Sequence, residues 1–307
     1  MVIDNISTIT HVTENNGSGA LSSLKREADI KQPTAEEYNA LASLYKSRNL
    51  TKKVIQFYAK ALALRESTLG FAHNLTANSY CDLAEANYEN KSVTEAIHLY
   101  EKALQIKETV LGKENPEVAV VYSSLANIYF AEKDFEKASQ FYKKALSIRV
   151  RGLGDHPHTA TSYQELAFFY ATVEEYEAAS PLFEKALEIR KELLKESHPD
   201  TATSYNNLAL CYYHLLDYAK AEENLEEAIR IRELLLEPDD EVLLSSKRNL
   251  EKIKERQPKL KKDFKKSLLK SVTKRYDNWF KVKKIYGSID FIKDFSLNNL
   301  KLSQKKI

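Results

Sequence analysis

The chain has 307 residues, a length that suggests about two domains. Only 7 Gly and 7 Pro occur in it, which argues against collagenous chains, glycine-rich disordered chains and turn-rich β-sandwiches. No apolar run approaches the ~20 residues of a transmembrane helix, and no secretory signal is visible at the N-terminus, so we expect a cytoplasmic protein. Cys81 and Cys211 are too few for a disulfide framework, and we expect both to be buried free thiols.

The net charge of +2 is divided unevenly along the chain. Residues 251–307 hold 18 Lys+Arg and 6 Asp+Glu, a balance of +12. Residues 1–250 hold the other 28 Lys+Arg and 38 Asp+Glu, a balance of −10. An acidic body therefore precedes a basic C-terminal segment.

A polar segment, residues 1–33, comes first, and we expect it to be disordered. From residue 34 to 242 a unit of 41 or 42 residues then recurs five times, starting near residues 35, 77, 119, 160 and 202. In the third unit, Leu125, Ile128 and Tyr129 recur with a helical period, and so do the apolar residues of the segment FYKKALSIR that follows. Each unit is therefore predicted to be two helices, A and B.

The ends of these helices are marked by residue type. Gly70, Gly112 and Gly154 are predicted to end B helices. A polar residue precedes each following A helix, at His73, Asn115, His156 and His198. A metal site at His156 and His158 is the competing interpretation, but equivalent positions lie one repeat apart, too far to share an ion, so we predict loop and cap residues and no metal. Small residues are predicted to let the helices approach closely, at Ala42, Ala84, Ala126, Ala167, Ala209, Ala96, Ala138, Ala179 and Ala221.

The third unit resembles the tetratricopeptide repeat at Tyr122, Leu125, Ala126, Tyr129, Ala138, Tyr142 and Ala145. The 42-residue period and the motif ALxIRxxxLGxxHPxTA are similar to the kinesin-light-chain subtype, over about residues 35–250. The resemblance implies an all-α fold, a right-handed α-solenoid of five antiparallel helix pairs. The glycine usual between helices A and B is replaced in every unit, by Asn49, Lys91, Lys133, Glu174 and Leu216. Each turn should be strained by ~1 kcal/mol if its φ stays positive.

After the fifth unit, residues 243–257 imitate a helix A, with Leu250 standing 42 residues after Leu208. Lys247 and Glu251 replace the Tyr and Ala of the repeat, so we predict a polar capping helix that ends before Pro258.

No phosphate-binding loop, dinucleotide fingerprint or catalytic motif is present, so we predict no enzyme, no catalytic residue and no cofactor. The resemblance implies a concave groove lined by helices A, in which an extended peptide of another protein binds. Its candidate residues are Asn39, Asp82, Glu85, Glu89, Asn127, Phe130, Gln164, Phe168, Asn206, Asn207, Leu210 and Tyr213. Amides suit peptide backbone, the apolar residues suit anchors, and the carboxylates favour a basic ligand.

The basic clamp that grips a terminal carboxylate in some chaperone-binding members is not reproduced, and the acidic groove departs from kinesin light chains, whose cargo peptides are acidic. We therefore predict a non-enzymatic adaptor or scaffold whose partner peptide carries basic and apolar residues. The competing interpretation is that the groove residues are ordinary solvated positions of a scaffold that binds elsewhere.

Residues 258–307 form a basic, amphipathic C-terminal segment. Its candidate surface is Lys261, Lys262, Lys265, Lys266, Lys270, Lys274 and Arg275. Four interpretations stay open: it caps the solenoid, adsorbs to an anionic membrane, binds nucleic acid, or occupies the chain's own acidic groove. The alternative function is thus a scaffold that associates with membrane or nucleic acid through this segment.

Overall fold

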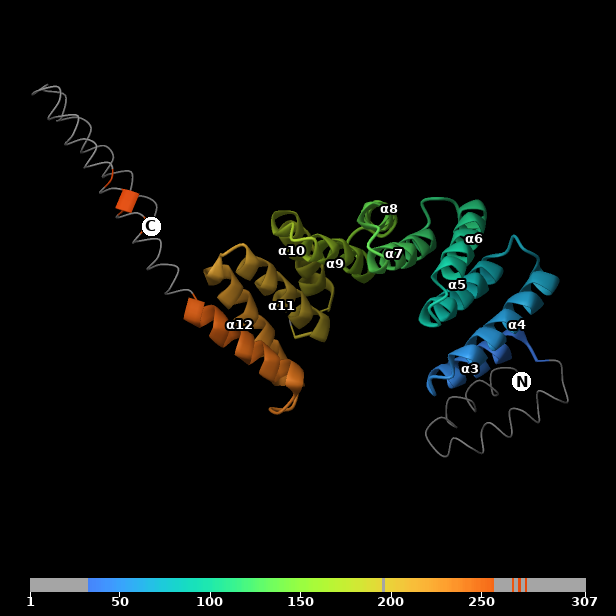
Figure 1. Cartoon of the computed structure of the whole chain (residues 1–307), viewed down its shortest axis with the longest axis horizontal. Coiled ribbons are helices and arrows are strands. Elements are labelled where there is room, and N and C mark those ends of the chain that lie inside the picture. Colours follow the sequence, from blue (N-terminus) through green and yellow to red (C-terminus); the bar gives the residue numbers. More distant parts are fainter. Residues whose placement is uncertain (1–32, 195–196, 257–266, 268–269, 272–273, 275–307) are drawn as a thin grey trace, which may run out of the picture. The chain divides into compact units, whose positions relative to one another are not determined.

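A computed structural model describes residues 33–194 and 197–256, together with residues 267, 270, 271 and 274 (Figure 1). This part of the chain is helical and contains no strand. It divides into two compact units, one ending at Ser204 and the other beginning at Tyr205. The all-α fold predicted from the sequence is confirmed.

The helices alternate between a shorter A helix and a longer B helix, as the sequence period requires. Their bounds are α3 (Ala35–Lys46), α4 (Thr51–Leu69), α5 (Asn74–Glu89), α6 (Val93–Leu111), α7 (Pro116–Ala131), α8 (Phe135–Leu153), α9 (Pro157–Thr172), α10 (Tyr176–Leu194), α11 (Pro199–His214) and α12 (Tyr218–Leu235). A further helix covers residues 241–256. From α3 to α10, each helix packs against the next one in the chain.

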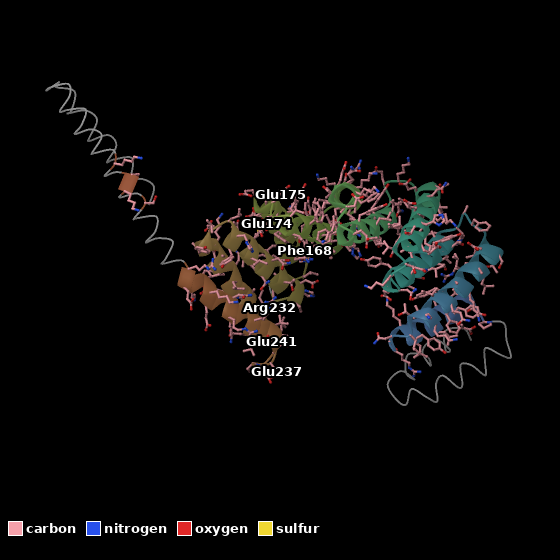
Figure 2. The ribbon with its side chains drawn as sticks, in the orientation of Figure 1. Phe168, Glu174, Glu175, Arg232, Glu237 and Glu241 are labelled. Carbon is pink, nitrogen blue, oxygen red and sulfur yellow. The ribbon has the colours of Figure 1, made fainter. Side chains whose placement is uncertain are left out.

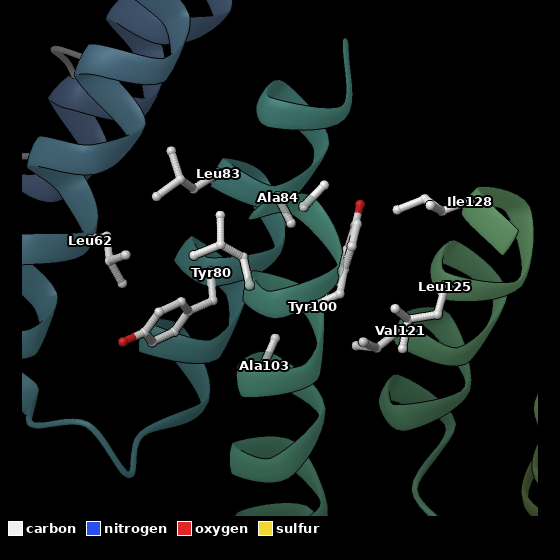
Figure 3. Packing of buried hydrophobic residues seen from close by; sticks show 11 residues of the cluster. Leu62, Tyr80, Leu83, Ala84, Tyr100, Ala103, Val121, Leu125 and Ile128 are labelled. Carbon is white, nitrogen blue, oxygen red and sulfur yellow. The ribbon is translucent and has the colours of Figure 1, made fainter. Parts of the chain in front are cut away.

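Small residues sit where neighbouring helices come closest. Ala84, Ala126, Ala96 and Ala138 are completely buried, as predicted from their place in the repeat. Around Ala84 and Ala96, larger side chains of α4, α5, α6 and α7 form one continuous cluster (Figure 3), with members Leu62, Tyr80, Leu83, Tyr100, Val121, Leu125 and Ile128. Because this cluster draws on three successive repeats, the helix pairs bury their apolar faces against one another.

The start of each A helix is fixed by a side-chain cap. The Nδ1 atoms of His73, His156 and His198 each accept a hydrogen bond at 3.1 Å from the backbone N–H two residues later. Asn115 does the same through Oδ1 at 2.9 Å. Such caps satisfy backbone donors that the first helical turn leaves without partners. The prediction that these are cap residues is confirmed.

The turn between helices A and B has the same backbone in all five units. Asn49, Lys91, Lys133, Glu174 and Leu216 have φ between 57° and 67°. In the third unit, the N–H of Lys133 donates to the carbonyl of Phe130 at 3.0 Å, and that of Asp134 donates to Tyr129 at 2.8 Å. This pair of bonds is the Schellman ending of a helix, which calls for a left-handed residue. The condition under which the sequence predicts strain, a positive φ, is therefore met in every one of these turns.

The helix of residues 241–256 packs beside α12 in the second unit. Leu243 and Ile253 are buried, and Arg232 of α12 donates a hydrogen bond to Ser246. Lys254 forms ion pairs with Glu222 at 3.4 Å and with Glu226 at 2.8 Å. The helix therefore packs against α12, and its role as a cap of the solenoid stays a prediction.

Candidate functional site

The predicted groove residues all lie on A helices, and they differ in exposure. Phe168 and Leu210 are each 56% exposed, so both offer apolar surface to a ligand. The exposed polar members are Glu85, Glu89 and Asn127, and the half-buried members are Asn39, Asp82, Phe130, Gln164, Asn206, Asn207 and Tyr213. The predicted groove residues are amides, carboxylates and apolar side chains.

A cluster of aromatic side chains connects α7 and α9 in the compact unit that ends at Ser204. The ring centroids of Phe130 and Phe168 lie 6.3 Å apart, with the rings edge to face. Phe130 also lies 6.0 Å from Phe169, which is buried. Phe168, whose place is labelled in Figure 2, is therefore an exposed extension of an aromatic cluster that includes the buried Phe169. Together with Asn127 and Gln164, Phe130 and Phe168 form what we term the α7/α9 face.

The amides predicted to meet a peptide already make internal hydrogen bonds through their oxygen atoms. Tyr142 donates to Asn127 Oδ1 at 2.5 Å, and Arg190 donates to Gln164 Oε1. In the fifth repeat, Arg232 donates to Asn206 Oδ1 at 3.2 Å. Each amide is thus held by a side chain of the B helix of its own repeat.

The predicted acidic residues of α5 are partly neutralised by α3. Lys46 lies 2.9 Å from both Glu85 and Glu89. Asn39 donates to Asp82 Oδ2 at 3.3 Å, while its own Oδ1 is buried without a hydrogen-bond partner. Burial raises the pKa of Asp82 above its ordinary value, so this carboxylate is poorly solvated. A basic ligand residue would have to compete with Lys46.

A buried basic residue near the end of each B helix is the feature that sequence reasoning missed. These residues are Arg65, Lys107, Arg149, Arg190 and Arg232. Four of them donate to a serine about 14 residues on, at Ser79, Ser162, Ser204 and Ser246. In the second repeat the basic residue is Lys107, and Val121 stands at the position of the serine. Lys107 instead contacts Asn74 at 3.0 Å and Glu117 at 2.7 Å. The signal was present in the sequence, since the basic residue and the serine both follow the repeat period.

We term these five buried basic residues the basic ladder. Glu165 of α9 contacts one of them, Arg149. Its Oε2 accepts from Ser123 at 2.9 Å and lies 3.7 Å from Arg149. Burial raises the pKa of Glu165, against the hydrogen bond from Ser123 and the charge of Arg149. The carboxylate depends on these two partners because it has lost much of its hydration.

Two further groups of predicted residues add little to the site. Of the predicted tail surface, Lys270 and Lys274 are helical and exposed, while Lys261, Lys262, Lys265, Lys266 and Arg275 lie outside the described residues. Cys81 and Cys211 are not joined in a disulfide, and burial raises the pKa of Cys81 to about 12. Cys211 is buried as predicted, but Cys81 is only half-buried.

Metal sites and membrane spans were also sought. Within residues 33–194 and 197–256, no group of His, Cys, Asp and Glu has the arrangement of a metal site. His156 and His158 lie with ring centroids 5.0 Å apart, and His156 is occupied as a cap. No helix of the described chain is long and apolar enough to cross a membrane.

Comparisons with known proteins identify the same helical repeat fold. The family profile described as tetratricopeptide repeat matches residues 75–151, 117–168 and 158–234, just over half of the chain. The crystal structure of BtubC (BKLC) from P. vanneervenii is similar over 76% of this chain and 93% of that chain, with 25% identity and a TM-score of 0.61. Nearly identical TPR-like repeats of kinesin light chain type from Podosopora anserina match over 66% of this chain and 97% of that chain, with 25% identity and a TM-score of 0.57. A search among curated proteins gives no match.

Proposed function

Because the chain belongs to the tetratricopeptide repeat family, whose repeats are scaffolds for protein–protein interaction and are generally non-enzymatic, we propose that it binds an extended peptide of a partner protein through its A helices. The observation that carries the proposal is the α7/α9 face. There, the exposed Phe168 stands beside Phe130, and the amides of Asn127 and Gln164 lie on the same two helices. An apolar anchor flanked by polar groups is the usual composition of an energetic centre in a protein interface.

The chemistry of the face indicates what the peptide carries. An apolar side chain would cover Phe168, and burying a large apolar side chain contributes about 1.5–3 kcal/mol. A basic residue of the peptide would be drawn towards Asp82, Glu85 and Glu89, mainly raising the rate of encounter, because Lys46 already pairs with two of them. A cytoplasmic location stays a prediction from the sequence.

The test is selection of peptides on the full chain from a displayed random library, followed by affinity measurement with two matched variants. Phe168→Ala removes the proposed anchor site, and we expect the selected peptides to bind at least about tenfold more weakly. Phe71→Ala is the control, since Phe71 is a 66% exposed phenylalanine in the loop between α4 and α5. Equal losses in the two variants, or no selectable peptide at all, would refute the proposal.

A further inference from the structure

The buried arginines of the ladder determine which end of the neighbouring amide faces outward. A guanidinium group has five N–H donors and no acceptor. An amide that contacts it must therefore turn its oxygen, and not its NH₂ group, towards the arginine. Arg190 makes this contact with Gln164, and Arg232 makes it with Asn206, one repeat later.

Both arginines are themselves held in place. Arg190 also donates to Ser204, whose hydroxyl donates to the carbonyl of Asp200 at 3.0 Å. Arg232 donates to Ser246, whose hydroxyl donates to the carbonyl of Val242 at 2.7 Å. The hydroxyl of each serine donates its one hydrogen bond to a backbone carbonyl, so its oxygen accepts the hydrogen bond from the arginine. The direction of every hydrogen bond in this chain is therefore fixed.

We propose that Arg190 and Arg232 are positioning residues: each presents the NH₂ group of its neighbouring amide, Gln164 or Asn206, so that a peptide bound at that amide is recognised by its backbone carbonyl oxygens. This inference rests on the proposed function and specifies its chemistry. An amide that could rotate would offer either a donor or an acceptor to a peptide. An amide whose oxygen is held by arginine offers donors alone, and it therefore selects carbonyl acceptors.

The charges around Gln164 are paired within the protein. Arg190 bonds the oxygen of Gln164, and the half-buried carboxylate of Glu165, the next residue of α9, is paired with Arg149 at 3.7 Å. A neutral peptide carbonyl would therefore need no counter-charge at this position. The apolar Phe168 stands one helical turn further along α9, so a carbonyl contact and an apolar anchor can be used by the same peptide.

Gln164→Glu separates the two ends of this side chain. Glutamate has nearly the same shape and gives Arg190 a stronger acceptor, but it has no N–H to donate. We expect folding stability to be kept and the affinity for peptides selected on the wild-type chain to fall about tenfold or more. Gln164→Met, which serves neither partner, should lower both stability and affinity. Unchanged peptide affinity in Gln164→Glu would overturn the inference.

A second experiment needs no ligand. In an NMR spectrum of the full chain, the side-chain NH₂ signals of Gln164 and Asn206 should be separated from that of Gln140, which lies on an exposed surface. Arg190→Lys should move the Gln164 signals and leave those of Asn206, and Arg232→Lys should do the reverse. Signals that ignore these substitutions would overturn the positioning role.

The two experiments distinguish the inference from the proposed function. If no peptide binds the wild-type chain, the proposed function fails and the assignment of carbonyl oxygens fails with it, whatever the NMR signals show. If peptides bind and Phe168→Ala weakens them but Gln164→Glu does not, the proposed function stands and only the inference is overturned.

Discussion

Five residues between the A and B helices keep a left-handed backbone without glycine. For an L-residue this conformation costs roughly 1–2 kcal/mol, least for Asn. The sequence identified all five positions, because the family's glycine is missing at the same register in every unit. It could do so because a Schellman ending is a local structure, and the repeat period shows where each one falls.

Leu216→Gly should stabilise the compact unit that begins at Tyr205. Leu216 has φ 63° and is 57% exposed, so glycine removes strain and little packing. Part of the gain is offset by the larger entropy of glycine in the unfolded chain, leaving a net gain of up to about 1 kcal/mol. Urea denaturation of the full chain would show a higher midpoint. Asn49→Gly is the matched comparison and should gain less, since Asn tolerates φ 57° well; a larger gain for Asn49→Gly would contradict the strain argument.

Asp82 provides a pH-dependent prediction at the same scale. Burial raises its pKa in the folded protein, whereas in the unfolded chain the value is ordinary, about 3.9. Between those two values the folded state binds more protons, so this residue's contribution to stability falls as pH rises. Asp82→Asn removes that loss and supplies a donor within reach of the unpartnered Asn39 Oδ1.

We therefore expect Asp82→Asn to be more stable than wild type at pH ~7 by about 1 kcal/mol, with the difference shrinking towards pH ~4. Denaturation midpoints measured across this range check the prediction. Glu89→Gln is the control, because it breaks an exposed pair with Lys46 and should change stability by less than ~1 kcal/mol. A stability difference for Asp82→Asn that grows as pH falls would have the wrong sign.

At the scale of helices, the sequence predicted the elements and missed what connects successive repeats. The alternation of Ala with large apolar residues belongs to one helix pair and is readable from the period alone. The bond from Arg149 to Ser162 joins two repeats, and its role depends on which side chains a buried guanidinium can reach. Comparing the repeats with one another would have revealed this bond, because in the second repeat Lys107 and Val121 replace the arginine and the serine together.

Arg149→Ala should be strongly destabilising. Arg149 is buried and donates to Ser123 and Ser162, and its loss leaves the half-buried Glu165 without its cation. Removing one partner of such a pair costs about 3–5 kcal/mol. Arg151→Ala, on the same helix, breaks the exposed pair with Glu114 at 3.0 Å and should cost less than ~1 kcal/mol. Urea denaturation compares the two variants, and similar losses would show that the ladder carries no special stability.

For the molecule as a whole, prediction from sequence succeeded where the chain repeats itself. The candidate site was predicted less completely, because the repeat pattern assigns Asn127, Gln164 and Asn206 to the groove without showing that each amide oxygen is already bonded. The contact of Lys46 with Glu85 joins two repeats, and that of Arg190 with Gln164 joins the two helices of one repeat, so neither partner follows from the pattern of the A helices alone.

The basic C-terminal segment leads to a prediction about charge. Residues 251–307 carry a balance of +12 and residues 1–250 one of −10, so a chain ended after Arg256 is acidic but keeps the helix that covers α12. We expect the shortened chain to unfold at the same urea concentration and to bind selected peptides as the full chain does. Binding to anionic vesicles or RNA should be confined to the full chain and should weaken steeply with salt, because contacts of this kind are screened. If the shortened chain instead loses the peptides, the basic segment is part of the protein-binding surface, and the A helices alone do not account for recognition.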